Sequence, residues 1–204
     1  MTSHPSREDP DRNGARSARP SDVLSFGLNF LKHPAMLGSI FPSSRYLVRR
    51  TLRWVDWSRA DLFVEFGPGV GTFTGEILSR MKPDARLVVF ETNPDFVRHL
   101  ESSLPDRRLE VVPDSAETLE DLVDGQPVDY VLSGIPFSLM PPETRDRILA
   151  GTCSALAPDG AMLVYQFSPR IRRHLERTFS EVRAEFEPRN FLPAMVFHCN
   201  CGSA

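Results

Sequence analysis

Short apolar segments alternate with helical patterns along most of the chain, and this alternation limits the possible folds more than any other feature. The apolar segments are rich in Val, Leu and Phe and have the length of strands that are buried on both faces. Such strands, separated by helices, are typical of a parallel sheet covered on both sides. We expect strands at 62–66, 86–91, 108–112, 128–133 and 161–167, with helices at 72–81, 94–103, 116–123 and 142–157.

The end of the chain departs from this alternation. Residues 181–187 and 194–200 both have the pattern of strands, and the loop between them contains Pro and Asn. A loop this short joins antiparallel neighbours. The expected fold is therefore an α/β, doubly wound, mostly parallel seven-stranded sheet that ends in an antiparallel hairpin.

A glycine-rich turn follows the first expected strand directly. Gly67, Gly69 and Gly71 allow a tight turn and a close approach of the backbone to a ligand, and a helix begins near Thr72. The spacing does not match the G-x-G-x-x-G turn that binds dinucleotides, and no G-K-[ST] sequence follows, which excludes a P-loop.

The sequence E-x-G-x-G-x-G, which begins at Glu65, resembles the cofactor signature of class I S-adenosylmethionine-dependent methyltransferases. The resemblance implies a fold of the expected kind and roles for residues at four successive strand ends. Glu91 would accept hydrogen bonds from the ribose hydroxyls, with Asn93 beside it, and Asp114-Ser115 would bind the adenine amino group. The segment from Ser133 to Phe137 would lie where the substrate meets the methyl group. The cofactor residues so predicted are Glu65, Gly67, Gly69, Gly71, Glu91, Asn93, Asp114, Ser115 and Ser133.

Each of these side chains also has a structural explanation. Glu65 could be a surface carboxylate, and Glu91 could cap the next helix, although Asn93 suits that role better. Asp114 could cap the helix at 116–123, and Phe137 could be a core aromatic residue. Trp54 and Trp57 have the character of packing residues and not of a substrate cage.

Five longer segments resemble the bacterial phospholipid N-methyltransferase family, which is similar to the ribosomal RNA adenine dimethylases. The resemblance covers about residues 22–200, and its most characteristic part runs from Gly38 to Arg45. It implies methylation of the phosphatidylethanolamine amine, in up to three steps, toward phosphatidylcholine. The segments are FLKHPAMLGSIFPSSRYLVRRTL (30–52), VEFGPGVGTFTGEIL (64–78), VVFETNPDFVRHL (88–100), SGIPFSLMPPETRDRIL (133–149) and NFLPAMVF (190–197).

The N-terminal part of the chain fits a membrane-bound substrate. Residues 1–20 have the composition of a disordered tail, and residues 22–33 have the pattern of an amphipathic helix. An arginine-rich helix is expected at about 43–55. We expect residues 21–60 to contact an anionic membrane surface or to form a lid over the active site, ahead of a methyltransferase domain at 61–204.

Bulk composition adds few constraints. The net charge is −3, but residues 1–60 hold ten Lys/Arg against five Asp/Glu, which favours an anionic partner or a solvated linker. The three cysteines match neither a disulfide framework nor a zinc spacing, and no signal peptide is visible. We expect a cytoplasmic enzyme at the inner face of the membrane that uses no metal.

RNA is the alternative substrate. An adenine-methylating relative would carry an amide where this chain has Ser133-Gly134, and no basic helical domain follows the expected methyltransferase domain. RNA is therefore the weaker choice, and DNA is not expected. Another small amine, or a cofactor-binding protein without catalytic activity, stays open.

Methyl transfer to nitrogen is an in-line displacement that depends mainly on alignment of donor and acceptor. The sequence offers no obligatory general base. Candidates near the methyl group are Ser133, through its hydroxyl or carbonyl, and the aromatic rings of Phe137 and Tyr46. The candidates for contact with the lipid head group are Ser44, Arg45 and Arg49, and we expect the two arginines to meet its phosphate.

Overall fold

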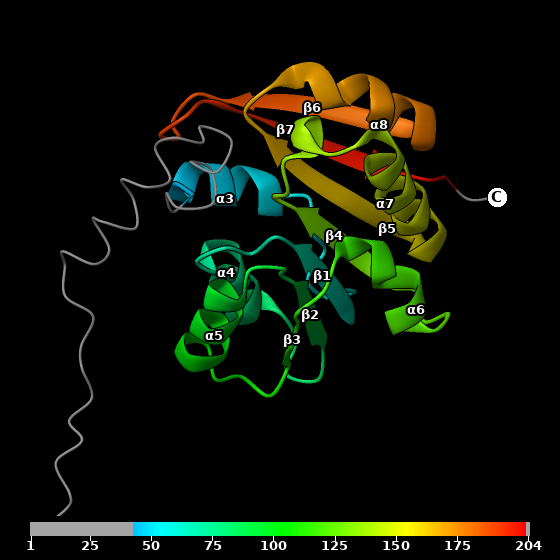
Figure 1. Ribbon diagram of the computed structural model, residues 1–204. Coiled ribbons are helices and arrows are strands. Elements are labelled where there is room, and N and C mark those ends of the chain that lie inside the picture. The colour runs from blue at the N-terminus through cyan, green and yellow to red at the C-terminus, as the bar shows by residue number, and fades with distance from the viewer. Residues whose placement is uncertain (1–42, 203–204) are drawn as a thin grey trace, which may run out of the picture. The chain divides into compact units, whose positions relative to one another are not determined.

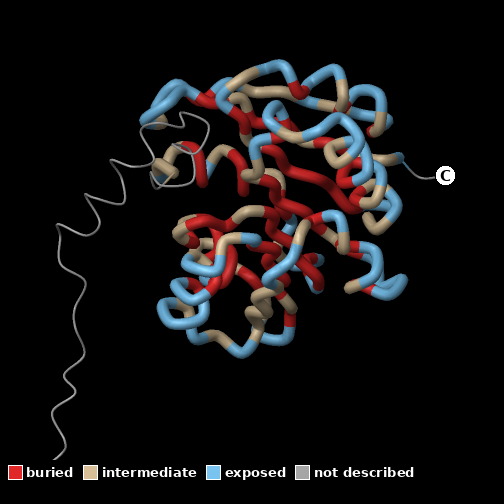
Figure 2. Tube along the Cα trace, viewed as in Figure 1, coloured by how far each residue is buried: buried red, intermediate tan, exposed pale blue. Residues whose placement is uncertain are grey.

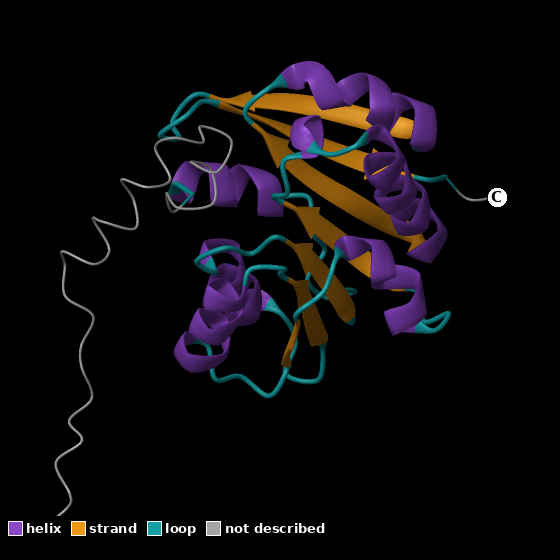
Figure 3. Ribbon diagram, viewed as in Figure 1, coloured by secondary structure: helices purple, strands orange, loops and turns teal. Residues whose placement is uncertain are grey.

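Residues 43–202, which are the part of the chain described by this computed structural model, form a seven-stranded sheet with helices on both faces (Figures 1 and 3). The strand order is β3-β2-β1-β4-β5-β7-β6, and β7 runs antiparallel to both of its neighbours, so β6 runs in the same direction as β1–β5. The strands are β1 (Leu62–Phe66), β2 (Arg86–Phe90), β3 (Leu109–Val112), β4 (Val128–Ser133), β5 (Leu156–Gln166), β6 (Glu181–Glu187) and β7 (Ala194–Asn200). The helices are α3 (Arg45–Leu52), α4 (Thr72–Arg80), α5 (Pro94–Ser103), α6 (Leu119–Val123), α7 (Pro142–Ala155) and α8 (Arg172–Thr178).

The sheet separates two apolar layers, and its central strands are the most deeply buried part of the molecule (Figure 2). One layer lies beneath α3, α4 and α5 and includes Phe63, Phe73 and Leu100. The other lies beneath α6, α7 and α8 and includes Val131 and Leu175. Burial of both faces explains why the strands read as continuous apolar runs.

The register of the parallel strands places the carboxyl ends of β1, β2 and β4 next to one another. Phe66, the last residue of β1, lies opposite Phe90 in β2 and opposite Ser133 in β4. The segments that follow these strands therefore share one edge of the sheet, which we call the carboxyl edge. Because β7 runs antiparallel to β5, the β6–β7 loop (188–193) also lies at the carboxyl edge.

The expected fold class is confirmed, and several elements have the expected bounds. β1, β4, β6, β7 and α5 match the prediction at both ends. The predicted helix at 116–123 is a 3-10 turn followed by α6, and α3 forms the core of the helix expected at 43–55. The predicted tail at 1–20 and helix at 22–33 lie outside the described residues.

Three features differ from expectation. β5 begins at Leu156 and not at 161, and it includes Pro158 and Gly160, where its pairing with β4 shifts register. α8 was not predicted, because its polar sequence carries only one buried side chain within the helix. Cys153 of α7 and Cys201 form a disulfide, although they are 48 residues apart in the sequence.

Candidate cofactor site and basic groove

The glycine turn after β1 has the backbone conformation that its sequence suggests. Gly67, Gly69 and Gly71 have φ values of 68°, 56° and 78°, a region that residues with a Cβ atom rarely adopt. The Gly67 amide donates to the Phe90 carbonyl at 2.9 Å, which joins the turn to β2. A Cβ atom at Gly67 would lie 2.6 Å from the Ile135 side chain. The turn is therefore packed directly against the segment that follows β4.

Glu91 faces this turn from the end of β2. Its Oε2 accepts from the Gly69 amide at 3.2 Å and its Oε1 from the Asn93 amide at 2.9 Å, and the residue is buried. Glu91 does not cap α5, because the Asn93 side chain does so by accepting from the Asp95 amide. The Glu91 carboxylate is thus held beside the glycine turn, as a ribose-binding role requires.

Asp114 is similarly available at the end of β3. Ser115, and not Asp114, caps the following turn by accepting from the Glu117 amide. The exposed Asp114 carboxylate accepts a hydrogen bond from the amide of the adjacent residue, Ser115, at 2.6 Å. The structure therefore removes the capping alternative for Asp114 and places its side chain at the carboxyl edge.

Glu65 is not a surface carboxylate. It is 2% exposed, and its Oε2 accepts from the Thr74 hydroxyl of α4 at 2.7 Å. Burial raises the pKa of Glu65 to about 8, against a lowering effect of the Thr74 hydrogen bond. At neutral pH the Glu65 side chain is therefore mostly protonated.

Two predicted catalytic groups lie inside the protein. The Ser133 side chain is fully buried, and its Oγ has no hydrogen-bond partner within residues 43–202. Phe137 is also fully buried and belongs to the apolar layer beneath α6–α8. The ring of Phe137 thus has a core position and no open face toward a substrate, and for Ser133 the backbone carbonyl remains the candidate group.

Tyr165, near the end of β5, is an aromatic residue that lies beside the segment after β4. Its hydroxyl lies where a Cβ atom of Gly134 would be, and its ring stacks on Phe73 of α4 at a centroid distance of 4.9 Å. Burial, and the nearby Glu65 carboxyl, raise the pKa of Tyr165, while a hydrogen bond from Ser43 opposes this. Tyr165 therefore presents a neutral hydroxyl beside the segment that follows β4. A lone Tyr in the apolar run AMLVYQF was the only signal for it.

Gln166 fixes the same segment from the next position of β5. Its Nε2 donates to the Ile135 carbonyl at 2.8 Å. The Gly134 amide donates to the Phe66 carbonyl at 3.0 Å. The segment after β4 is therefore held by both β1 and β5, with Gly134 between the glycine turn and Tyr165.

The residues at the carboxyl edge fit S-adenosylmethionine. The glycine turn with its positive φ values lies at this edge, and Glu91 and Asp114 offer carboxylates at the ends of β2 and β3. The fully buried Ser133 hydroxyl, which has no hydrogen-bond partner in the described part of the chain, lies at the end of β4. The described residues contain no group of three or more His, Cys, Asp or Glu side chains that could hold a metal ion.

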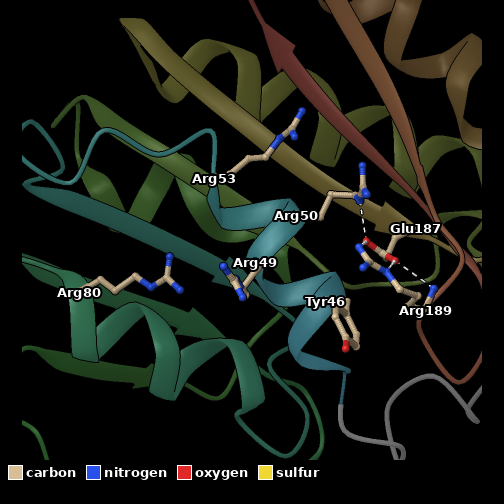
Figure 4. A pocket seen from close by; sticks show the side chains of 7 residues that line it. All are labelled: Tyr46, Arg49, Arg50, Arg53, Arg80, Glu187 and Arg189. Atoms are coloured by element: carbon tan, nitrogen blue, oxygen red, sulfur yellow. Dashed lines mark hydrogen bonds and ion pairs between the residues drawn. The ribbon is translucent and has the colours of Figure 1, made fainter.

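A basic groove of about 600 Å³ lies along the outer side of α3 (Figure 4). It receives arginines from three separate elements: α3 and the residue after it, the end of α4, and the β6–β7 loop. Arg49 and Arg80 point toward one another from opposite sides of the groove (Figure 4). The lining residues are Tyr46, Arg49, Arg50, Arg53, Arg80, Glu187 and Arg189.

Acidic side chains neutralise part of this groove. Glu187 is buried and accepts from Arg50 at 2.6 Å and from Arg189 at 3.1 Å. Burial would raise the pKa of Glu187, but the hydrogen bonds from these arginines lower it to about 2. Arg53 pairs with Glu185. Among residues 43–202, Arg49 forms no ion pair, so its charge is available for an anion.

The remaining predicted substrate residues, Ser44 and Arg45, and the predicted catalytic residue Tyr46 lie at the carboxyl-edge end of the groove. Ser44 is engaged in the fold, because its Oγ accepts from the Leu47 amide and donates to the Arg189 carbonyl at 2.8 Å. Arg45 is exposed and donates to the Tyr46 hydroxyl at 3.0 Å. The Tyr46 ring also lies against the Arg189 guanidinium, at 4.3 Å from its centroid. Tyr46 therefore borders the groove.

No helix among the described residues has the length and apolar character needed to cross a membrane.

Comparison with known proteins agrees with this geometry. A family model described as a methyltransferase domain matches residues 63–160. The chain is 34% identical over 183 residues to the ornithine lipid N-methyltransferase of Singulisphaera acidiphila, which covers 87% of this chain and 95% of that protein. It is 29% identical over 128 residues to the ribosomal RNA small subunit methyltransferase A of Thermotoga neapolitana, which covers 61% of this chain and 45% of that protein.

A solved structure with the same fold contains a product of the cofactor. It is the N-methyltransferase NodS of Bradyrhizobium japonicum in complex with S-adenosyl-L-homocysteine, with a TM-score of 0.58 and 15% identity over 75% of this chain and 82% of that one. The fold, the glycine turn and the long match to a lipid-methylating enzyme lead to one conclusion. The chain belongs to the class I S-adenosylmethionine-dependent methyltransferases, in the family of the ornithine lipid N-methyltransferase, and is an S-adenosylmethionine-dependent N-methyltransferase.

Proposed function

We propose that the protein methylates the amine of a membrane lipid whose head group also carries an anion, with phosphatidylethanolamine as the substrate. The observation that carries this proposal is the basic groove, where Arg49 lies without an acidic partner among the described residues. A phosphate or carboxylate would offset the charge of this arginine. The 34% identity to an enzyme that acts on a lipid supports the same substrate class.

Ornithine lipid is the second candidate. The relative from Singulisphaera acidiphila is matched over 95% of its length, and its name states that it methylates this lipid. An aminolipid of either type pairs an amine with an anionic group, so the groove by itself does not favour one over the other. Ribosomal RNA is weaker, since the match to the RNA enzymes is shorter and Ser133-Gly134 replaces the amide that would contact an extruded base.

The reaction needs little acid–base chemistry from the protein. S-adenosylmethionine, when bound, supplies a methyl group on a sulfonium with a good leaving group. The chain would position the acceptor: Gly134, which has no Cβ atom, lets the Tyr165 hydroxyl approach the segment after β4, and Gln166 holds the Ile135 carbonyl. The neutral Tyr165 hydroxyl is suited to accept a hydrogen bond from the incoming amine, while the ammonium proton passes to water.

The chain would work as a peripheral enzyme at the inner face of the membrane. Its arginines in α3 would attract an anionic leaflet, and residues 22–53 would form the contact. Glu65, Glu91, Asn93, Asp114 and Ser115 would surround the cofactor, of which Glu91 would meet the ribose and Asp114 the adenine.

Transfer of labelled methyl groups tests the substrate. Vesicles containing phosphatidylethanolamine, vesicles containing ornithine lipid, and ribosomal RNA would be incubated separately with the enzyme and labelled S-adenosylmethionine. Label in phosphatidylethanolamine products supports the proposal. Label only in ornithine lipid would replace phosphatidylethanolamine by the second candidate, and label only in RNA would contradict a lipid substrate altogether.

A further inference from the structure

The exposed large apolar side chains of residues 43–202 gather at the carboxyl edge. Leu139 follows β4, Phe167 follows β5, and Phe191 and Leu192 belong to the β6–β7 loop. Phe186 lies one residue before the end of β6. Their exposed fractions range from 37% to 69%. We call these five side chains the apolar rim.

Exposure on this scale is unusual for such side chains in this protein. Apolar side chains of this size are buried elsewhere in both layers of the protein. A cluster of exposed Phe and Leu side chains on one edge marks a surface that contacts another apolar phase. The rim lies on the same edge as Gly134 and the glycine turn, so whatever covers the rim also lies beside the candidate active site.

Basic side chains accompany the rim. Arg170 follows Phe167 by three residues and is exposed. Arg189 lies in the β6–β7 loop, and Arg45 begins α3 next to Ser44, whose amide donates to Asn190 of that loop at 2.8 Å. Glu187, the acidic residue of this hairpin end, is buried and paired with arginines. Apolar side chains flanked by arginines match the interfacial layer of a bilayer that contains anionic lipid.

We propose that the apolar rim docks on an anionic lipid bilayer, with Leu139 and Phe167 entering the interface and the flanking arginines contacting lipid phosphates. The inference rests on the proposed function, because a lipid acceptor brings the carboxyl edge to the bilayer. It also explains why the rim lies at this edge and not at the opposite one. A head group would then reach Gly134 while its acyl chains stay in the membrane.

Vesicle flotation of the full-length protein tests the proposal without any methyl transfer. The vesicles contain phosphatidylcholine and phosphatidylglycerol and no substrate lipid. The double variant Leu139→Ser/Phe167→Ser is compared with the conservative variant Leu139→Met/Phe167→Leu. We expect the serine variant to lose about ten-fold or more in vesicle affinity and the conservative variant to bind like the wild type.

A matched pair of arginine variants tests whether positive charge next to the rim contributes to vesicle binding. Arg170→Gln should weaken binding at low salt, whereas Arg107→Gln, a change at an exposed arginine in the loop between α5 and β3, should not. Unfolding curves and cofactor binding verify that each variant is folded. Equal binding by the serine variant and the wild type would overturn the proposal. So would a wild-type dimer that becomes a monomer in the serine variant while vesicle binding is unchanged.

The experiments give different results if the membrane-docking proposal is wrong and if the proposed substrate is wrong. With a short-chain, monomeric phosphatidylethanolamine, the serine variant should be as active as the wild type and lose activity only on vesicles. If no phosphatidylethanolamine is methylated by either protein, the proposed substrate is wrong, but the difference in flotation still supports the rim.

Discussion

The amide of Ser44 donates a hydrogen bond to the side-chain oxygen of Asn190 at 2.8 Å, across 146 residues of sequence. The Ser44 hydroxyl adds a bond to the Arg189 carbonyl. Two segments that resemble the phospholipid N-methyltransferases, one before β1 and one at the start of β7, are thereby joined at one end of the basic groove. The arrangement of this groove depends on the contact.

Ser44→Ala should destabilise the protein by about 1–2 kcal/mol, because it removes the cap of α3 and the bond to the β6–β7 loop. Urea unfolding measures this change. Ser79→Ala, at an exposed helical position, should change the free energy of unfolding by less than about 0.5 kcal/mol. Equal effects of the two substitutions would show that the Ser44 contacts do not contribute measurably to the free energy of unfolding.

Glu65 makes stability depend on pH. Its pKa is raised from 4.5 to about 8 in the folded protein, so the folded state holds a proton that the unfolded state releases. The resulting stabilisation is fully present below pH 4.5 and is lost as pH rises through about 8. Glu65→Gln should remove this dependence, which at its steepest is about 1.4 kcal/mol per pH unit. Urea unfolding of both proteins from acidic to basic pH compares the slopes, and parallel curves would contradict a protonated Glu65.

Glu91→Gln should weaken binding of S-adenosylmethionine by about ten-fold, because a charged acceptor beside the glycine turn is lost. Isothermal titration gives the dissociation constant. The matched control is Glu110→Gln in β3, where the carboxylate pairs with Arg86 instead. An unchanged affinity in Glu91→Gln would remove Glu91 from the cofactor site.

Gly134→Ala should reduce kcat by about ten-fold or more, because its Cβ atom would collide with the Tyr165 side chain and displace the acceptor position. Steady-state methyl transfer measures this loss. Gly75→Ala in α4 is the control, since its Cβ atom would meet Leu104 at an ordinary 3.8 Å. That change should stabilise the helix by about 0.5–1 kcal/mol and leave kcat unaltered. A normal kcat in Gly134→Ala would place the acceptor elsewhere.

Arg49→Gln should raise KM for the lipid by about ten-fold through loss of a charge-assisted contact, with no change in cofactor affinity. The control variant is Arg173→Gln, which changes an exposed arginine of α8 on the opposite face of the sheet from α3. A KM that rises equally in both variants would indicate general electrostatic attraction and not a head-group contact in the groove.

The sequence by itself determined all seven strands, most of the helices and the location of the glycine turn. Alternation of apolar and helical segments depends on local periodicity, which is written in neighbouring residues. The positive φ values of Gly67, Gly69 and Gly71 are likewise a local property that only glycine readily supplies. Asn93 could be identified as a cap because capping acts within one helical turn.

Only the tertiary structure decided which side chains share the site. Tyr165 meets Gly134 because β5 pairs with β4, and Phe137 is buried because a layer of helices covers that face of the sheet. The groove gathers arginines from α3, α4 and the β6–β7 loop, and the pairing of β7 with β5 brings that loop to the carboxyl edge. These contacts join residues that are far apart in the chain, so no local sequence pattern encodes them. They form only when strands distant in sequence pair with one another in the folded sheet.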